Sequence, residues 1–132
     1  MMVADTDVLI DFLDGRPPAA ERVALELDRG QLRTTVITRF ELLAGAKTSA
    51  QQRLVSELLA ALPCLLLDEP GADAAAEIRR TLERDGAGIG MADSLIAGIV
   101  VACRGVLLTR NRRHFERVPG LALGRLSQAE RN

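Results

Sequence analysis

Short apolar runs alternate with segments of helical spacing along this chain, and the alternation limits the folds open to it. The first run ends just before Asp5. Later runs cover residues 32–37, 64–67, 106–109 and 121–123. Most are continuously apolar, as strands buried on both faces are. Such strands separated by helices predict an α/β protein with a central, mostly parallel sheet flanked by helices.

The segments between these runs place apolar residues on one helical face. Thr38 and Glu41 match the capping-box pattern S/T-x-x-E, which predicts that one helix begins at Thr38. We expect helices over residues 8–13, 19–29, from Thr38 onward, and over 50–63, 71–86 and 91–103.

Length and composition favour a single domain over residues 1–132. The chain is 48% hydrophobic and 27% charged, which is typical of a globular protein. Its longest apolar run, LIAGIVVAC, has nine residues, whereas a membrane-spanning helix needs about 20. We expect no membrane association. The sequence shows no secretory leader, and Cys64 and Cys103 lie in apolar runs as reduced thiols would, so we expect a cytoplasmic protein.

Four polar residues stand where strands end or helices begin. Asp5 directly follows the first run, and Asn111 follows the run 106–109 by two residues. Glu41 and Asp93 fall in the first turns of their expected helices. Because ligands of parallel α/β sheets bind beyond the carboxyl ends of the strands, we expect all four side chains at one edge of the sheet.

These oxygen donors favour a hard divalent cation. Carboxylates without Cys or neighbouring His select Mg²⁺ or Mn²⁺ rather than Zn²⁺. The single His114 stands among arginines and is not expected to be a ligand. A bound Mg²⁺ usually completes its shell with water and substrate phosphate. Such a site activates water and stabilises charge on a phosphodiester, so phosphodiester hydrolysis is the predicted chemistry.

Each acid also has a structural interpretation. The capping box explains Glu41 equally well, and Asp5 could cap the helix that follows it. Asp93 would favour the positive end of its helix dipole, but that effect of ~0.3–1 kcal/mol is smaller than the cost of burying an ionised carboxylate. Asp93, a single carboxylate in a strongly apolar helix, is therefore least well explained by structure alone. We expect it to face away from the sheet at the exposed start of its helix.

The charge is unevenly distributed. Residues 1–103 hold 10 Lys and Arg against 16 Asp and Glu, whereas residues 104–132 hold 7 Arg against 2 Glu. This asymmetry suggests cation binding in one place and phosphate contact in another, although solvated surface charge explains any single arginine as well.

Four segments match one family in order and spacing. They are DTDVLIDFLDG, TRFELLAGA, IGMADSLIAGIVVA and LLTRNRRHFERVPGLAL. On these segments the chain resembles the PIN-domain ribonucleases, and among them the VapC toxins of bacterial toxin–antitoxin pairs. The resemblance implies a small Rossmann-like domain that binds Mg²⁺ or Mn²⁺ and cleaves RNA. It also implies a cognate VapB-type antitoxin that blocks the acidic site, and a toxin homodimer that forms a hetero-oligomer with it.

The resemblance also assigns individual residues. Asp5, Glu41 and Asp93 take the places of the family's first three acids, with Asp5 and Asp93 coordinating metal and Glu41 shaping the site. Asn111 stands where the family commonly has Asp, which leaves open whether a second metal binds. The residues expected to position water or RNA are Thr6, Thr109, Arg110, Arg112 and Arg113. The amphipathic helix over 50–63 is a candidate surface for the antitoxin or the second protomer, and core packing explains it equally well.

Two other functions remain open from the sequence. A catalytically inactive PIN-like binding module is favoured by Asn111 alone. The opening Asp5-Thr-Asp-Val-Leu also fits haloacid-dehalogenase-type phosphatases. That class needs a lysine after the hydroxyl that Thr109 would supply, and Lys47 is the only lysine in the chain.

Overall fold

A five-stranded parallel sheet forms the centre of the protein. The computed structural model describes residues 1–127. The strands are β1 Met2–Ala4, β2 Leu32–Thr35, β3 Cys64–Leu65, β4 Val106–Leu108 and β5 Ala122–Leu123. Their order is β3-β2-β1-β4-β5, and every neighbouring pair is parallel. The predicted α/β class is therefore confirmed, and the chain reverses its direction of winding between β1 and β4.

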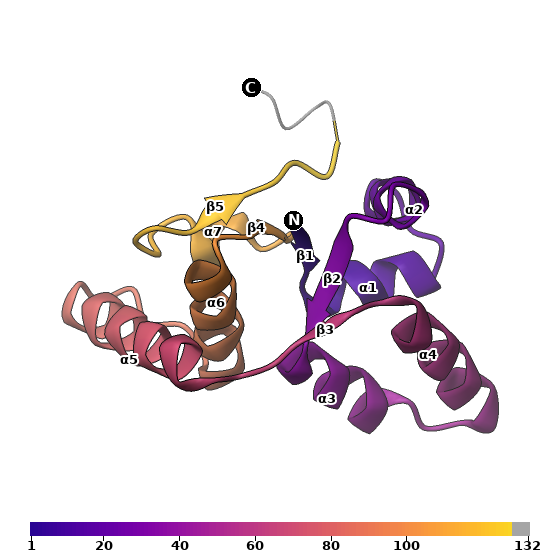
Figure 1. The fold of residues 1–132 in the computed structure, drawn as a ribbon, viewed down its shortest axis with the longest axis horizontal. Coiled ribbons are helices and arrows are strands. Elements are labelled where there is room, and N and C mark those ends of the chain that lie inside the picture. The colour runs from indigo at the N-terminus through magenta and orange to yellow at the C-terminus, as the bar shows by residue number, and fades with distance from the viewer. Residues whose placement is uncertain (128–132) are drawn as a thin grey trace.

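Helices cover both faces of this sheet (Figure 1). They are α1 Thr6–Leu13, α2 Ala19–Asp28, α3 Val36–Gly45, α4 Ser49–Ala61, α5 Glu69–Arg84, α6 Met91–Cys103 and α7 Arg112–Phe115. The pair α5 and α6 lies on one side of the strands, and α1, α2 and α4 lie on the other (Figure 1).

Two apolar cores result from the alternation of side chains along the strands. Val3 and Leu107 are fully buried in the core that α5 and α6 complete. Their neighbours Ala4 and Leu108 are fully buried in the core formed with α1, α2, α3 and α4. Because successive strand residues point to opposite faces, each central strand contributes to both cores.

Helix α6 packs closely against α5. Its apolar residues from Ile96 to Val100 are buried, whereas Asp93 in the first turn remains partly exposed. Gly98 allows the close approach, because a Cβ at that position would lie 2.6 Å from Ala75 N and from Gly71 O. Asp93 lies at the partly exposed start of the helix, as expected. It shares a helical face with Ile96, Ala97 and Val100, which are buried, so the expectation that it points away from the buried side of the helix is wrong.

The expected start of helix α3 at Thr38 is wrong. The helix begins at Val36, and its N-cap is Thr35, whose hydroxyl accepts a hydrogen bond from Thr38 N at 3.1 Å. Thr38 is itself fully buried. Glu41 therefore lies in the second helical turn, not the first, and no capping box explains its presence. A capping box forms instead at Thr48 and Gln51, at the start of α4.

The expected buried strand over residues 64–67 is also too long. Strand β3 ends at Leu65, and the side chain of Leu66 is 71% exposed. The reason is that β3 pairs only with β2 and lies at the sheet edge. The chain then leaves the sheet toward α5, which Asp68 caps by accepting a hydrogen bond from Gly71 N.

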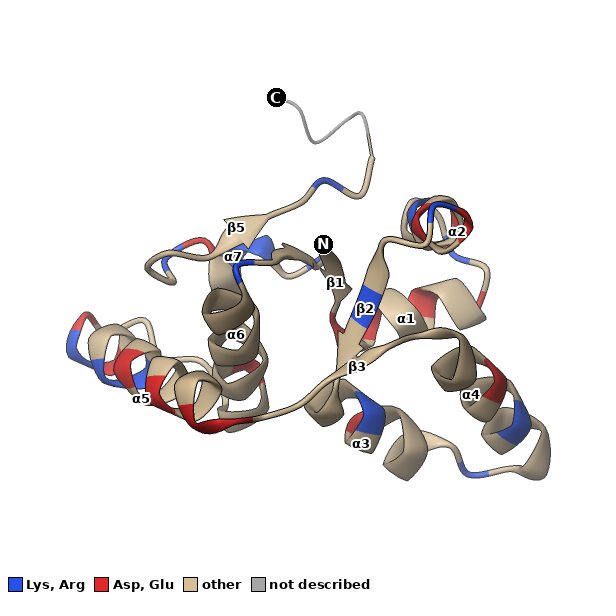
Figure 2. Ribbon diagram, viewed as in Figure 1, with Lys and Arg blue, Asp and Glu red and all other residues tan. Residues whose placement is uncertain are grey.

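Charged residues are spread along the helices and also occur in the segment around α7 (Figure 2). Within residues 1–127, no helix has the length and apolar character needed to cross a bilayer.

Replacing Gly98 with Ala is expected to lower the free energy of unfolding by about 3 kcal/mol, because the new methyl group meets the backbone of α5. Chemical denaturation measures this. The matched control is Gly45→Ala in α3, where a Cβ meets nothing within 4 Å and stability is expected to stay or rise by up to about 1 kcal/mol. Equal effects at the two glycines would refute the close contact between α5 and α6.

Candidate active site

Five of the nine predicted site residues line one acidic hollow of about 200 Å³, whereas Thr109 and the three candidate arginines do not line it. It lies at the carboxyl ends of β1 and β4, where the sheet reverses its winding and where ligands of such sheets bind. Its lining comprises Asp5, Thr6, Asp7, Glu41, Asp93, Asn111 and His114. The expectation that residues 5, 41, 93 and 111 share one edge of the sheet is confirmed in its geometry.

Asp5 is the most buried of these acids, with 4% of the residue exposed. It directly follows β1 and caps α1, with Oδ1 accepting a hydrogen bond from Val8 N at 3.0 Å. Burial raises the pKa of Asp5 to about 6, against the opposing hydrogen bonds from Thr109 and Val8. The Asp5 side chain therefore both caps α1 and lines the acidic hollow. Water solvates its charged form poorly.

Glu41 is oriented by a hydroxyl from the neighbouring helix. Thr6 Oγ1 donates to Glu41 Oε1 at 2.6 Å. The same Oγ1 lies 3.1 Å from the buried hydroxyl of Thr38. The hydrogen bond to Thr6 leaves Glu41 Oε2 available to accept a hydrogen bond from water.

Asp93 enters the hollow from the first turn of α6 and keeps 34% of its side chain exposed. His114 of α7 lies beside it, with 3.4 Å between His114 Nδ1 and Asp93 Oδ2. Sequence reasoning set His114 aside because its sequence neighbours are arginines. The turn of α7 nevertheless brings its ring to the acidic hollow, and no periodic or spacing signal marks this.

The loop after β4 is fixed by polar side chains. The main-chain N of Asn111 donates a hydrogen bond to Thr109 Oγ1 at 2.9 Å, and Thr109 is fully buried. The Asn111 side chain donates through Nδ2 to Asp7 Oδ2 at 2.9 Å. Asp7 is a site residue that the sequence analysis did not single out, although the motif Asp-Thr-Asp places it two residues from Asp5.

The three candidate arginines differ in their surroundings. Arg110 Nη1 contacts both carboxylate oxygens of Asp11, at 2.8 and 3.0 Å. Arg112 Nη1 donates to Gly124 O at 2.9 Å. Arg113 is exposed on α7. Arg110 and Arg112 thus support the fold around the site, and Arg113 projects its charge into solvent.

The donor set of the hollow fits a hard cation. All of its carboxylates and its amide offer oxygen, which Mg²⁺ and Mn²⁺ prefer. In the part of the chain that the structure describes, no three His, Cys, Asp or Glu side chains are grouped closely enough to hold an ion by themselves. Magnesium is commonly bound by one or two carboxylates with water and substrate completing its shell. The desolvated Asp5 carboxylate is the group that a cation would stabilise most directly.

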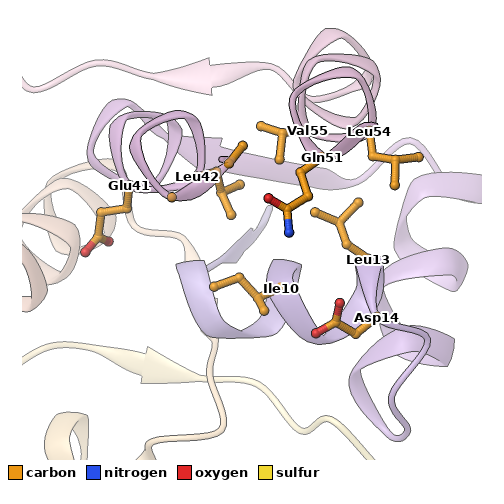
Figure 3. A pocket seen from close by; sticks show the side chains of 10 residues that line it. Ile10, Leu13, Asp14, Glu41, Leu42, Gln51, Leu54 and Val55 are labelled. Atoms are coloured by element: carbon orange, nitrogen blue, oxygen red, sulfur yellow. The ribbon is translucent and has the colours of Figure 1, made fainter. Parts of the chain in front are cut away.

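A second, more apolar groove of about 280 Å³ adjoins the acidic hollow (Figure 3). It is lined by side chains of α1, α3 and α4 and the turn between the last two, among them Ile10, Leu13, Leu42, Leu54 and Val55. Glu41 lines both the groove and the acidic hollow. The two pockets therefore meet at Glu41.

Comparison with known proteins gives consistent matches over nearly the whole chain. The model of the PIN domain matches residues 2–121. Ribonuclease VapC19 of Mycobacterium tuberculosis is 33% identical over 92% of this chain and 97% of its own length. The tRNA(fMet)-specific endonuclease VapC of Shigella flexneri is 31% identical over 89% of this chain and 91% of its own. DNA-bound VapBC from Salmonella typhimurium contains a chain that superposes with a TM-score of 0.82 at 29% identity, covering 96% of this chain and 98% of that one.

Replacing Asp5 with Asn is expected to stabilise the protein in EDTA at pH 8 by up to about 3 kcal/mol. The pKa of Asp5 rises from 3.8 to about 6 on folding. The folded state therefore binds the proton more tightly, and stability falls as pH rises from about 4 through about 6. Asn keeps the oxygen that caps Val8 N but carries no charge.

The measurement is the difference in unfolding free energy between Asp5→Asn and the wild type from pH 4 to pH 8. This difference should be near zero at pH 4 and grow through pH 6. A difference independent of pH would contradict the buried charge as its cause.

Proposed function

This chain belongs to the PIN domain family, and from that premise we propose that it is a VapC-type toxin that hydrolyses RNA with a divalent metal ion. The observation that carries the proposal is the meeting of Asp5, Glu41 and Asp93 in one hollow. Relatives named ribonuclease or endonuclease VapC support it, at 31–33% identity over 87–92% of this chain. The family match also excludes the haloacid-dehalogenase alternative.

In the proposed mechanism, Asp5 and Asp93 would hold Mg²⁺ or Mn²⁺. An ion bound there would lower the pKa of water and stabilise negative charge on the phosphodiester. Glu41, oriented through Oε1 by Thr6, accepts a hydrogen bond from the attacking water at its other oxygen. The buried Thr109 positions two site residues, because its hydroxyl hydrogen-bonds the Asp5 carboxylate and accepts a hydrogen bond from the main-chain N of Asn111.

RNA contact in this proposal rests on charge and shape. Arg110, Arg112 and Arg113 flank Asn111 in the sequence, and the exposed Arg113 is the one proposed to contact a phosphate. The chain has no Trp or Tyr. Phe115 is fully buried, and Phe40, next to Glu41 on α3, is 69% exposed. Within residues 1–127 one largely exposed aromatic side chain does not make the platform of several rings on which many readers of single-stranded RNA stack bases.

The proposed partner is a VapB-type antitoxin. VapBC from Salmonella typhimurium and VapBC-1 from Haemophilus influenzae are solved structures with chains 27–29% identical to this one. The groove between α1, α3 and α4 suits an antitoxin segment, because Ile10 and Leu54 are 38% and 49% exposed there while Asp14 and Glu41 offer negative charge. A basic antitoxin residue at Glu41 would block the acidic hollow. A toxin homodimer completes the proposed assembly.

The second candidate, an inactive binding module, is favoured by the missing carboxylate at Asn111. One assay separates the two.

The purified protein is expected to cleave RNA with Mg²⁺ or Mn²⁺ and not in EDTA. Asp93→Asn is expected to lower the cleavage rate by about 100-fold or more, because the variant loses metal binding and stabilisation of the transition state. The matched control is Asp73→Asn, which removes an exposed charge from α5 and should leave the rate unchanged. Absence of cleavage across cellular RNA with either metal would favour the inactive module.

Substitution of Leu54 by Asp is expected to weaken binding of the cognate antitoxin by at least about 10-fold, because it places a charge in the apolar groove. Titration calorimetry with purified antitoxin measures this. Leu25→Asp provides the control, since Leu25 is 41% exposed on α2 and lies outside the groove. Equal losses for both variants would argue against the groove as the antitoxin site.

A further inference from the structure

Asp7 lies in contact with the residue that breaks the expected acidic pattern. Asn111 Nδ2 donates to Asp7 Oδ2 at 2.9 Å across the junction of α1 and the loop after β4. Both side chains line the same hollow as Asp5 and Asp93. Asn111, which stands where the family commonly has Asp, is therefore hydrogen-bonded directly to a carboxylate.

The chemistry of this pair fixes its orientation. An ionised carboxylate only accepts hydrogen bonds, so Asn111 must turn its NH₂ group toward Asp7. The amide oxygen lies on the other arm of the same planar group. It makes no hydrogen bond to any of residues 1–127 in the structure. The pair consequently combines a negative charge with an amide oxygen available to accept from water.

Arg110 holds the loop on α1 without taking Asp7 as its main partner. Its Nη1 lies 2.8 Å from Asp11 Oδ1, whereas its Nη2 lies 3.8 Å from Asp7 Oδ1. The Asp11 side chain is only 10% exposed, and that of Asp7 is 40% exposed. The closer and more buried ion pair with Asp11 anchors the loop, which leaves most of the Asp7 charge available to the hollow.

We propose that Asp7 is the fourth carboxylate of the metal site and that Asn111 orients it, so that helix α1 supplies the charge missing from the loop after β4. This inference rests on the proposed function, because it concerns the same divalent cation. It predicts that the acid and the amide can exchange positions. The total charge and the hydrogen bond across the junction are both kept in such an exchange.

The test measures Mn²⁺ affinity by electron paramagnetic resonance of free Mn²⁺, without RNA and without an activity readout. Asp7→Asn removes the charge but keeps an oxygen that accepts from Asn111 Nδ2. We expect it to weaken Mn²⁺ binding by at least about 10-fold. The control is Asp28→Asn, which removes an exposed charge from the end of α2, outside both the acidic hollow and the apolar groove. Its affinity should match that of the wild type.

The double variant Asp7→Asn with Asn111→Asp is expected to return Mn²⁺ affinity to within about threefold of the wild type, with thermal denaturation confirming that both variants fold. Unchanged Mn²⁺ affinity in Asp7→Asn overturns the proposal, because Asn keeps the hydrogen bond to Asn111 and lacks only the negative charge. The proposal is also overturned if Asp7→Asn weakens Mn²⁺ binding and the double variant does not restore it. Asp5→Asn separates this inference from the proposed function. If Mn²⁺ still binds to Asp5→Asn, Asp5 does not hold the ion, and the metal site of the proposed function is itself contradicted.

Discussion

A carboxylate that water cannot fully solvate organises the site. Asp5 stands at the end of β1 with only 4% of the residue exposed, and its Oδ1 caps α1 through Val8 N. The cap sets where α1 begins, and this in turn directs Thr6 and Asp7 into the hollow. Since burial raises the pKa of Asp5 to about 6, a cation beside it relieves an unfavourable charge. The same interaction therefore serves the fold and the proposed chemistry.

The parallel topology explains how residues far apart in the chain reach that carboxylate. The winding reverses between β1 and β4, so the loops after these strands open onto a shared crevice. Asp5 N donates to Leu108 O at 3.1 Å, which ties the two strand ends together. On one face, Gly98 lets α6 approach α5 closely, and the first turn of α6 delivers Asp93. On the other, the hydroxyl of Thr6 holds Glu41 of α3.

Much of this arrangement could be predicted from sequence because it follows from periodicity. The bounds of α6 at Met91 and Cys103 agree with the expected helix, since a long apolar segment between glycines and polar residues leaves little choice. The start of α3 was wrong because Thr35 and Thr38 both offer a capping hydroxyl, and only packing decides that Thr38 is buried. His114 and Asp7 could not be assigned to the site in the same way. Their places depend on how α7 and the loop after β4 fold back onto α1, which is a long-range contact without a local pattern.

The central claim is that Asp5 and Asp93 hold one divalent cation between them. Anomalous scattering from Mn²⁺ in crystals of the protein tests it directly. The account predicts a peak at about 2.1 Å, the length of a metal–oxygen bond, from one carboxylate oxygen of each residue. A peak elsewhere in the molecule, with both carboxylates beyond bonding distance at a concentration that saturates Mn²⁺ binding in solution, would contradict it.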